Sequence, residues 1–182
     1  MHARIAKLCA AAAGACLGAC GATAGQVKAE PPPSLAVDLS LTGAGTPALA
    51  AHCAVKNISS QPVNLLDSPR MPYLIHESGT LVVLDGVSPP EDNVLGAIEI
   101  PLTQALPPGA SLAFDVPLTP IHLRSHYGEQ ADPGLHGATP IVCRVAHGAT
   151  PIDAAARAHT TITGLLAWQQ FESSLTLVVK LP

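Results

Sequence analysis

The sequence is poor in aromatic residues and in charge, and each shortage excludes a class of protein. Aromatic side chains make up 3% and charged side chains 12% of the 182 residues, and the charged share is about half of that in average globular domains. The formal net charge of -4 excludes a nucleic-acid binder that works through a basic surface. The 18 prolines exclude a helical bundle or coiled coil, because an interior proline costs about 3 kcal/mol in a helix.

Motifs of several enzyme classes are also missing from the sequence. There is no Gly-x-Ser-x-Gly elbow, no phosphate-binding P-loop, and no Gly-x-Gly-x-x-Gly after a strand-like run. The adjacent carboxylates Glu91 and Asp92 follow two prolines and read as a solvated loop. We therefore expect a non-catalytic protein that carries no cofactor.

The N-terminus has the pattern of a secretion signal. Arg4 and Lys7 precede an uncharged stretch over residues 8–19 that contains only Leu, Ala, Gly and Cys. Twelve helical residues span about 18 Å, which is too short for a bilayer core of about 30 Å. No later stretch reaches 18 apolar residues without a charge or a proline. The pattern predicts a leader that directs export, followed by a chain without a membrane-spanning helix.

The leader ends in Leu17-Gly18-Ala19-Cys20, which resembles the lipobox of bacterial lipoproteins. The resemblance implies cleavage before Cys20, a signal peptide over residues 1–19, and diacylation of Cys20, which anchors the protein in a membrane. Two or more acyl chains give stable anchoring that a single chain cannot. Gly21, in place of the Asp that retains such lipoproteins at the inner membrane, implies the outer membrane, with the domain facing the periplasm. The alternative is cleavage after Ala22-Thr23-Ala24, which would release a soluble periplasmic or secreted protein.

Residues 20–34 are expected to form a flexible tether, since they lack periodicity and contain three consecutive prolines at 31–33. Such a proline run is a stiff polyproline II spacer. Residues 35–182 then form a single domain.

Five cysteines stand at positions 9, 16, 20, 53 and 143. Cys9 and Cys16 leave with the leader, and Cys20 takes the lipid. Cys53 and Cys143 remain as a pair in a compartment that supports disulfides, and both lie in strand-like surroundings. We expect them to form a disulfide; the alternative is two separately buried thiols.

Short runs of alternating or continuous apolar residues predict a protein made of strands. The candidate strands are 35–41, 48–55, 63–66, 72–76, 80–84, 95–102, 112–118, 139–147 and 174–181. Turn-forming residues separate them at 57–62, 77–79, 85–86, 107–109 and 132–134. One stretch, 152–158, reads as helical. These features predict an all-β, antiparallel sandwich of about 7–9 strands.

The domain resembles immunoglobulin-like β-sandwiches. Cys53 in the second strand and Cys143 in a late strand match the bridge between the two sheets of that fold, and Leu106-Pro107-Pro108-Gly109 resembles the approach to its strand E. Ile141 replaces the tyrosine that antibody-type domains carry two residues before the second cysteine. The resemblance therefore implies immunoglobulin-like architecture without antibody-type membership.

Histidines suggest a metal-binding alternative, because imidazole is a common ligand of zinc and copper. His122 and His126 are four residues apart, which places both rings on one face if the segment is helical. Cys143 and His147 have a spacing similar to that of blue-copper loops, although no methionine follows. The competing interpretation is that these histidines lie in surface loops, and the metal hypothesis remains the alternative function.

Two segments are candidates for binding a partner. Arg124 and Tyr127 belong to the polar connection 119–138, and loops at the ends of sandwiches often recognise partners. Trp168 and Phe171 form the second candidate, whose competing interpretation is a plug in the core. A further possibility is an edge strand that adds to a partner's sheet. We expect a lipid-anchored envelope protein with a binding or structural role, whose partner is another envelope protein.

Overall fold

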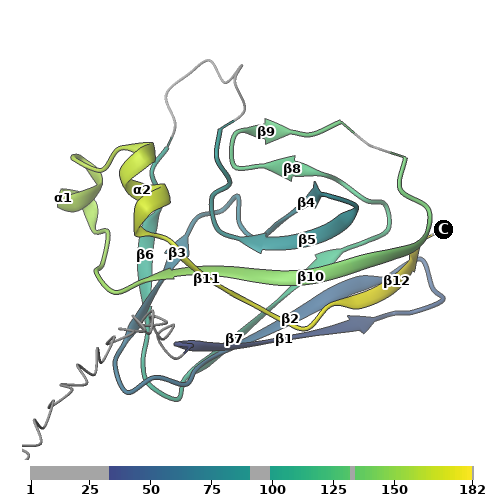
Figure 1. The fold of residues 1–182 in the computed structure, drawn as a ribbon, viewed down its shortest axis with the longest axis horizontal. Helices are drawn as coiled ribbons and strands as arrows, with labels where there is room; N and C mark the ends of the chain where they lie inside the picture. The colour runs from purple at the N-terminus through teal and green to yellow at the C-terminus, as the bar shows by residue number, and fades with distance from the viewer. Residues whose placement is uncertain (1–32, 91–98, 132–133, 182) are drawn as a thin grey trace, which may run out of the picture. The chain divides into compact units, whose positions relative to one another are not determined.

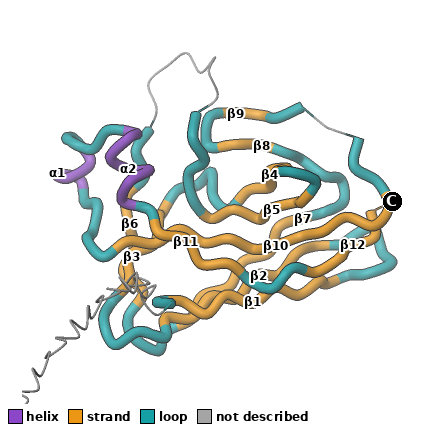
Figure 2. The backbone as a smooth tube through the Cα atoms, viewed as in Figure 1, coloured by secondary structure: helices purple, strands orange, loops and turns teal. Residues whose placement is uncertain are grey.

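Strands dominate the protein, and two short helices lie together at one end (Figures 1 and 2). The computed structural model describes residues 33–90, 99–131 and 134–181. The leader, the lipobox with Cys20, and the tether up to residue 32 lie outside the described residues. No helix within the described ranges is long and apolar enough to cross a membrane.

The first sheet has three antiparallel strands in the order β1-β2-β7. Their bounds are Leu35–Thr42, Ala50–Asn57 and Ser111–Pro117. Burial along β2 alternates, so that Ala51, Cys53 and Val55 face inward while the residues between them are half-buried. This is the period-2 pattern expected for a strand with one face on a core.

The second sheet is larger and is organised around the 12-residue strand β10, Gly137–Gly148. A β4-β5 hairpin, formed by Tyr73–Glu77 and Thr80–Asp85, pairs with β10 through β5. Strand β3, Val63–Asp67, pairs with β10 and with β6, Leu102–Leu106. The C-terminal strands β11, Gln170–Ser173, and β12, Leu177–Leu181, also pair with β10.

Strands β5 and β3 follow one another along the same edge of β10. Arg144 pairs with Leu84 of β5 and with β11, so β5 and β11 occupy opposite edges of β10. His147 pairs with Leu65 of β3 and again with β11, so β3 lies on the same edge as β5. The two strands therefore share this edge of β10. Strand β5 ends at Asp85, which pairs with Val145, and the pairing with β3 begins two residues later at His147.

The all-β class is confirmed, but the sheets are not purely antiparallel. Strand β5 pairs with β10 in parallel, because the long connection between them returns the chain in the same direction. The described residues form twelve strands rather than seven to nine. The surplus comes from the two-residue strands β8, Arg124–Ser125, and β9, Gly128–Glu129, and from a C-terminal segment that forms two strands instead of one.

The predicted strand at 95–102 is wrong in its described part: residues 99–101 form no strand, and β6 begins at Leu102. The predicted helix at 152–158 corresponds to α1, Ala154–Arg157, where the Asp153 carboxylate accepts hydrogen bonds from the amides of Ala155 and Ala156. A second helix, α2, Ile162–Trp168, was not predicted, and its buried Leu165 packs on the outer face of the second sheet.

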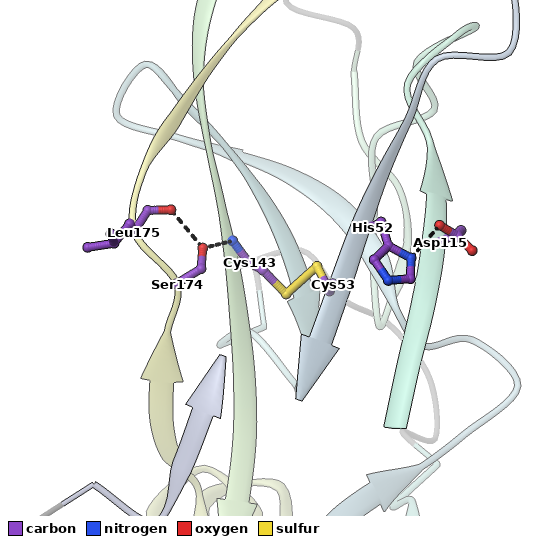
Figure 3. The surroundings of a disulfide bond; sticks show 6 residues. All are labelled: His52, Cys53, Asp115, Cys143, Ser174 and Leu175. Carbon is purple, nitrogen blue, oxygen red and sulfur yellow. Dashed lines mark hydrogen bonds and ion pairs between the residues drawn. A yellow bond between two sulfur atoms is a disulfide. The ribbon is translucent and has the colours of Figure 1, made fainter. Parts of the chain in front are cut away.

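The two sheets face each other across the main hydrophobic core, and the predicted disulfide links them (Figure 3). Cys53 of β2 and Cys143 of β10 are both fully buried, with their Cα atoms 6.2 Å apart. Beside the bridge the pairing partner of β10 changes from β11 to β12. There the Ser174 hydroxyl accepts the Cys143 amide hydrogen bond over 3.0 Å and donates to the Leu175 carbonyl. The hydroxyl thus replaces a backbone carbonyl of the ladder where the strand bulges.

Candidate functional site

The predicted binding segment forms a small hairpin beside the second sheet. Strands β8 and β9 pair Arg124 with Glu129 and Ser125 with Gly128. The hairpin adjoins β4 through a bridge between Leu123 and Leu74, and Figure 1 shows it stacked alongside β4 and β5.

Side chains at the hairpin's turn fix it to neighbouring segments through backbone carbonyls. The Tyr127 hydroxyl donates to the Ser88 carbonyl over 2.7 Å. The His126 ring is buried, and its Nε2 lies 2.8 Å from the Glu99 carbonyl oxygen. Because a carbonyl only accepts, His126 carries its proton on Nε2 when neutral. Both anchors are hydrogen bonds to backbone carbonyls, and they hold the turn in place.

Two arginines lie next to this turn, and each hydrogen-bonds to the backbone of the segment that carries the other. The Arg124 Nη2 donates to the backbone carbonyl of Arg70 over 3.1 Å, and the Arg70 Nη1 donates to the carbonyl of His126 over 3.1 Å. Neither guanidinium forms an ion pair with a carboxylate among the described residues. A guanidinium has five N–H donors in a fixed fork, so each retains donors for an outside acceptor.

Two hollows meet at Arg124. One of about 210 Å³ is lined by Arg70, Arg124, His126, Tyr127 and Glu129 among others. The other, of about 340 Å³, shares Arg124 and Glu129 and extends over Tyr73 to His122 and Asp115. We call the residues Arg70, Arg124, Tyr127 and Glu129 the hairpin site.

Burial also shapes the acid–base properties of the hairpin site. Desolvation by burial, together with repulsion from the Tyr73 phenolate at high pH, raises the pKa of Tyr127 to about 12. The phenol therefore stays protonated at physiological pH and keeps donating to Ser88. Arg70 was not predicted as a site residue, since it lies in a loop more than fifty positions before Arg124 and only tertiary contact brings them together.

The histidine predictions need correction. The segment with His122 and His126 is not a helix: His122 is exposed, whereas His126 is buried and held by Glu99, so the surface-loop interpretation fails for His126. The Cys143 thiolate of the copper hypothesis does not exist, because its sulfur is in the disulfide. Across the described ranges no group of three or more metal-ligating side chains lies together.

His147 is also buried rather than on the surface. Its Nε2 has no hydrogen-bond partner and lies 3.8 Å from the Glu172 carboxylate. Burial lowers the pKa of His147, and Glu172 opposes that effect only in part. The ring is therefore a neutral core residue at pH 7.

The second predicted binding segment divides into a half-buried part, Trp168, and an exposed part, Phe171. The Trp168 indole packs with the cluster around Leu165, and its Nε1 donates to the Thr150 carbonyl over 2.8 Å, which supports the core interpretation for Trp168. Phe171 is 43% exposed and remains on the surface.

We predict that Gly148→Ala is strongly destabilising. A Cβ at this position would overlap the Trp168 indole ring, and overpacking of this kind costs about 1–3 kcal/mol. Urea unfolding measures the loss. In a Trp168→Ala background the same substitution should cost at least 1 kcal/mol less, because the obstacle is gone. Equal costs in both backgrounds would contradict the packing argument.

Comparisons of the chain with family models, with curated proteins and with solved structures found no match. The leader pattern, the disulfide and the side chains of the hairpin site are therefore the features that indicate function.

Proposed function

We propose that this chain is a lipid-anchored protein of the bacterial cell envelope that binds a partner protein and has no catalytic role. In this proposal the lipid on Cys20 holds the protein at the outer membrane. The proline-rich tether then presents an immunoglobulin-like β-sandwich to the periplasm. The lipobox pattern Leu17-Gly18-Ala19-Cys20 supports the anchor. The Cys53–Cys143 disulfide supports an oxidising compartment, because such bonds are rare in the cytosol.

The immunoglobulin-like assignment is supported by the position of the disulfide. It joins β2 of one sheet to β10 of the other across the core, as the bridge between the two sheets does in that fold. The parallel pairing of β5 with β10 is a departure from purely antiparallel immunoglobulin sheets, so the proposal concerns architecture rather than strand order.

The observation that carries the binding role is the pair of arginines without a carboxylate partner among the described residues. Arg70 and Arg124 are fixed by each other's backbone segments, and holding two like charges together is unfavourable until an anion arrives. A carboxylate forms a bidentate pair with a guanidinium group, through two parallel hydrogen bonds. We therefore infer that the hairpin site recognises an acidic segment of an envelope protein.

The anchor is tested by replacing the lipidated residue. We expect the wild-type protein in the membrane fraction, with an intact mass that begins at Cys20, carries acyl chains and rises by about 2 Da on reduction of the disulfide. Cys20→Ala should lose the acyl mass and leave the membrane fraction, because the anchoring chains are absent. A wild-type protein that is soluble and begins near Gly25 would refute the anchor.

The hairpin site is tested with a tetraglutamate peptide as the probe. Arg124→Ala should weaken binding of the peptide about tenfold, as expected for loss of one charge-assisted hydrogen bond. Arg157→Ala removes the same charge from an exposed position of α1 and should leave the affinity unchanged. Isothermal titration at two salt concentrations measures both. If the two variants weaken binding equally, the attraction is general and the hairpin site is not the recognition surface.

A further inference from the structure

A third pocket lies near the C-terminal end of β5, where β3 replaces β5 along the edge of β10. Asp85 is the last residue of β5. It pairs with Val145 of β10, which belongs to the main core, and two residues earlier Val83 also faces that core. By the alternation of side chains along a strand, Asp85 points inward between the two sheets.

The Asp85 side chain is largely buried, its carboxyl oxygens are not completely enclosed, and it has no partner among the described residues. Its residue is 7% exposed, and it forms no hydrogen bond or ion pair with any other described residue. Buried carboxylates are almost always paired or hydrogen-bonded. An unpaired one that still faces an open pocket points to a ligand that supplies the missing donor.

The pocket in front of Asp85 has a volume of about 230 Å³, and six of its nine lining residues are apolar. Leu65 of β3, Leu106 of β6 and Leu112 of β7 contribute its apolar walls. Gln104 and Ser111 also line it, and both are exposed, so the pocket is open to solvent between β6 and β7. We call this the Asp85 pocket.

We propose that the Asp85 pocket binds an alkylammonium group, with the ammonium donating to the Asp85 carboxylate and the hydrocarbon part contacting Leu65, Leu106 and Leu112. A volume of about 230 Å³ corresponds to about seven or eight water molecules and holds a short alkyl chain with its ammonium head. The group comes either from a free amine or from a lysine side chain of another molecule.

A divalent metal fits the Asp85 pocket less well. Calcium takes six to eight oxygen ligands and magnesium six, whereas the lining offers one carboxylate, one amide and one hydroxyl among leucines, an alanine and a proline. Zinc prefers cysteine and histidine, and neither lines the pocket. The apolar walls instead suit a ligand with a hydrocarbon body.

The charged neighbours of Asp85 set the pH at which binding appears. Asp67 lies at the end of β3, and its like charge adds to the effect of burial; together they raise the pKa of Asp85 to about 7. Tyr73 of β4 is the other titratable group that interacts with Asp85, and its own pKa is raised mainly by burial. Strands β6 and β7 line the pocket without a titratable side chain. The ammonium group should therefore bind to the ionised form, which predominates above pH 7.

The test uses the full chain and n-butylammonium chloride as the probe, with n-butanol as the uncharged match, followed by isothermal titration at pH 8 and pH 6. We expect n-butylammonium to bind at least tenfold more tightly than n-butanol at pH 8, and about tenfold more weakly at pH 6 than at pH 8. A Gly-Lys-Gly peptide with blocked ends is titrated in parallel. Tighter binding of the peptide assigns the pocket to a lysine side chain, and tighter binding of n-butylammonium assigns it to a free amine.

Two variants and one control make the outcome decisive. Asp85→Asn should abolish the preference for the ammonium over the alcohol, and Leu112→Phe should weaken both probes by filling the pocket. Asp38→Asn removes the same charge from an exposed position of β1 and should bind as the wild type does. Equal affinity for the two probes, no binding of n-butylammonium by a folded wild-type protein, or unchanged binding by Asp85→Asn would each overturn the proposal.

Discussion

Removing the disulfide should lower the free energy of unfolding by about 4 to 5 kcal/mol. Cys53 and Cys143 are 90 positions apart, and in the chain-entropy treatment a crosslink that closes a loop of this length restricts the unfolded chain by that amount. Small domains have a total stability of about 5–15 kcal/mol. The loss therefore amounts to between about a quarter and nearly all of that stability.

Urea unfolding of the oxidised and the reduced wild-type protein measures this effect, because the two forms have the same side chains and differ in the crosslink. The Cys53→Ala/Cys143→Ala variant is the companion measurement and should be insensitive to reductant. Both sulfurs are fully buried, so this variant should be somewhat less stable than the reduced wild type, through lost packing. A reduced protein as stable as the oxidised one would show that the crosslink does not constrain the unfolded chain.

Asp85→Asn should stabilise the protein at pH 8 but not at pH 4. Burial raises the pKa of Asp85 to about 7, from an ordinary value of 3.8. Between these values the folded state binds a proton that the unfolded state has released, so the contribution of Asp85 to stability falls as the pH rises from about 4 to about 7. The full difference corresponds to about 4 kcal/mol. An uncharged amide of the same shape avoids that loss.

The stability difference between Asp85→Asn and the wild type, measured by urea unfolding across this pH range, isolates the carboxyl group. The comparison with the wild type is needed because the contribution of His147 to stability changes with pH in the opposite direction. Its lowered pKa makes the folded state more stable as the pH rises toward 6.5. Asp38→Asn, on exposed β1, should differ from the wild type by less than about 0.5 kcal/mol at every pH. A pH-independent difference for Asp85→Asn would mean that the carboxyl group is solvated in the folded protein.

The strands that sequence analysis locates best are those with one clear buried face. Alternation over 35–41 predicted β1, which runs from Leu35 to Thr42. The Ser78-Gly79 turn predicted at 77–79 is present between β4 and β5, and both residues have positive φ, as a tight two-residue hairpin requires. In such segments the local pattern and the tertiary burial agree.

The local sequence pattern does not predict features that depend on pairing between distant segments of the chain. Asp85-Gly86 reads as a turn, yet Asp85 is a buried strand residue, because β10 pairs with it from sixty positions away. Helix α2 begins with two β-branched residues and a glycine, which weakens the helical signal. It forms where Leu165 finds a buried position against the second sheet.

The hairpin site was predicted in part for the same reason. Arg124 and Tyr127 stood out because they lie in a polar connection, and that signal is local. Arg70 is contributed by the loop before β4, and only the hydrogen bonds with the hairpin reveal its role.

The placement of the disulfide also determines how the protein carries mechanical load. A chain tethered at Cys20 and gripped at the hairpin site would be stretched between its N-terminus and residues 124–129. That pull reaches Cys53 and then passes through the covalent bridge to Cys143, a short step along the chain from the hairpin. The segment from β3 to β7 lies in the bypassed loop and cannot be drawn out by tension between membrane and partner. Under such a load the crosslink would limit how far the domain can be extended, in addition to its effect on equilibrium stability.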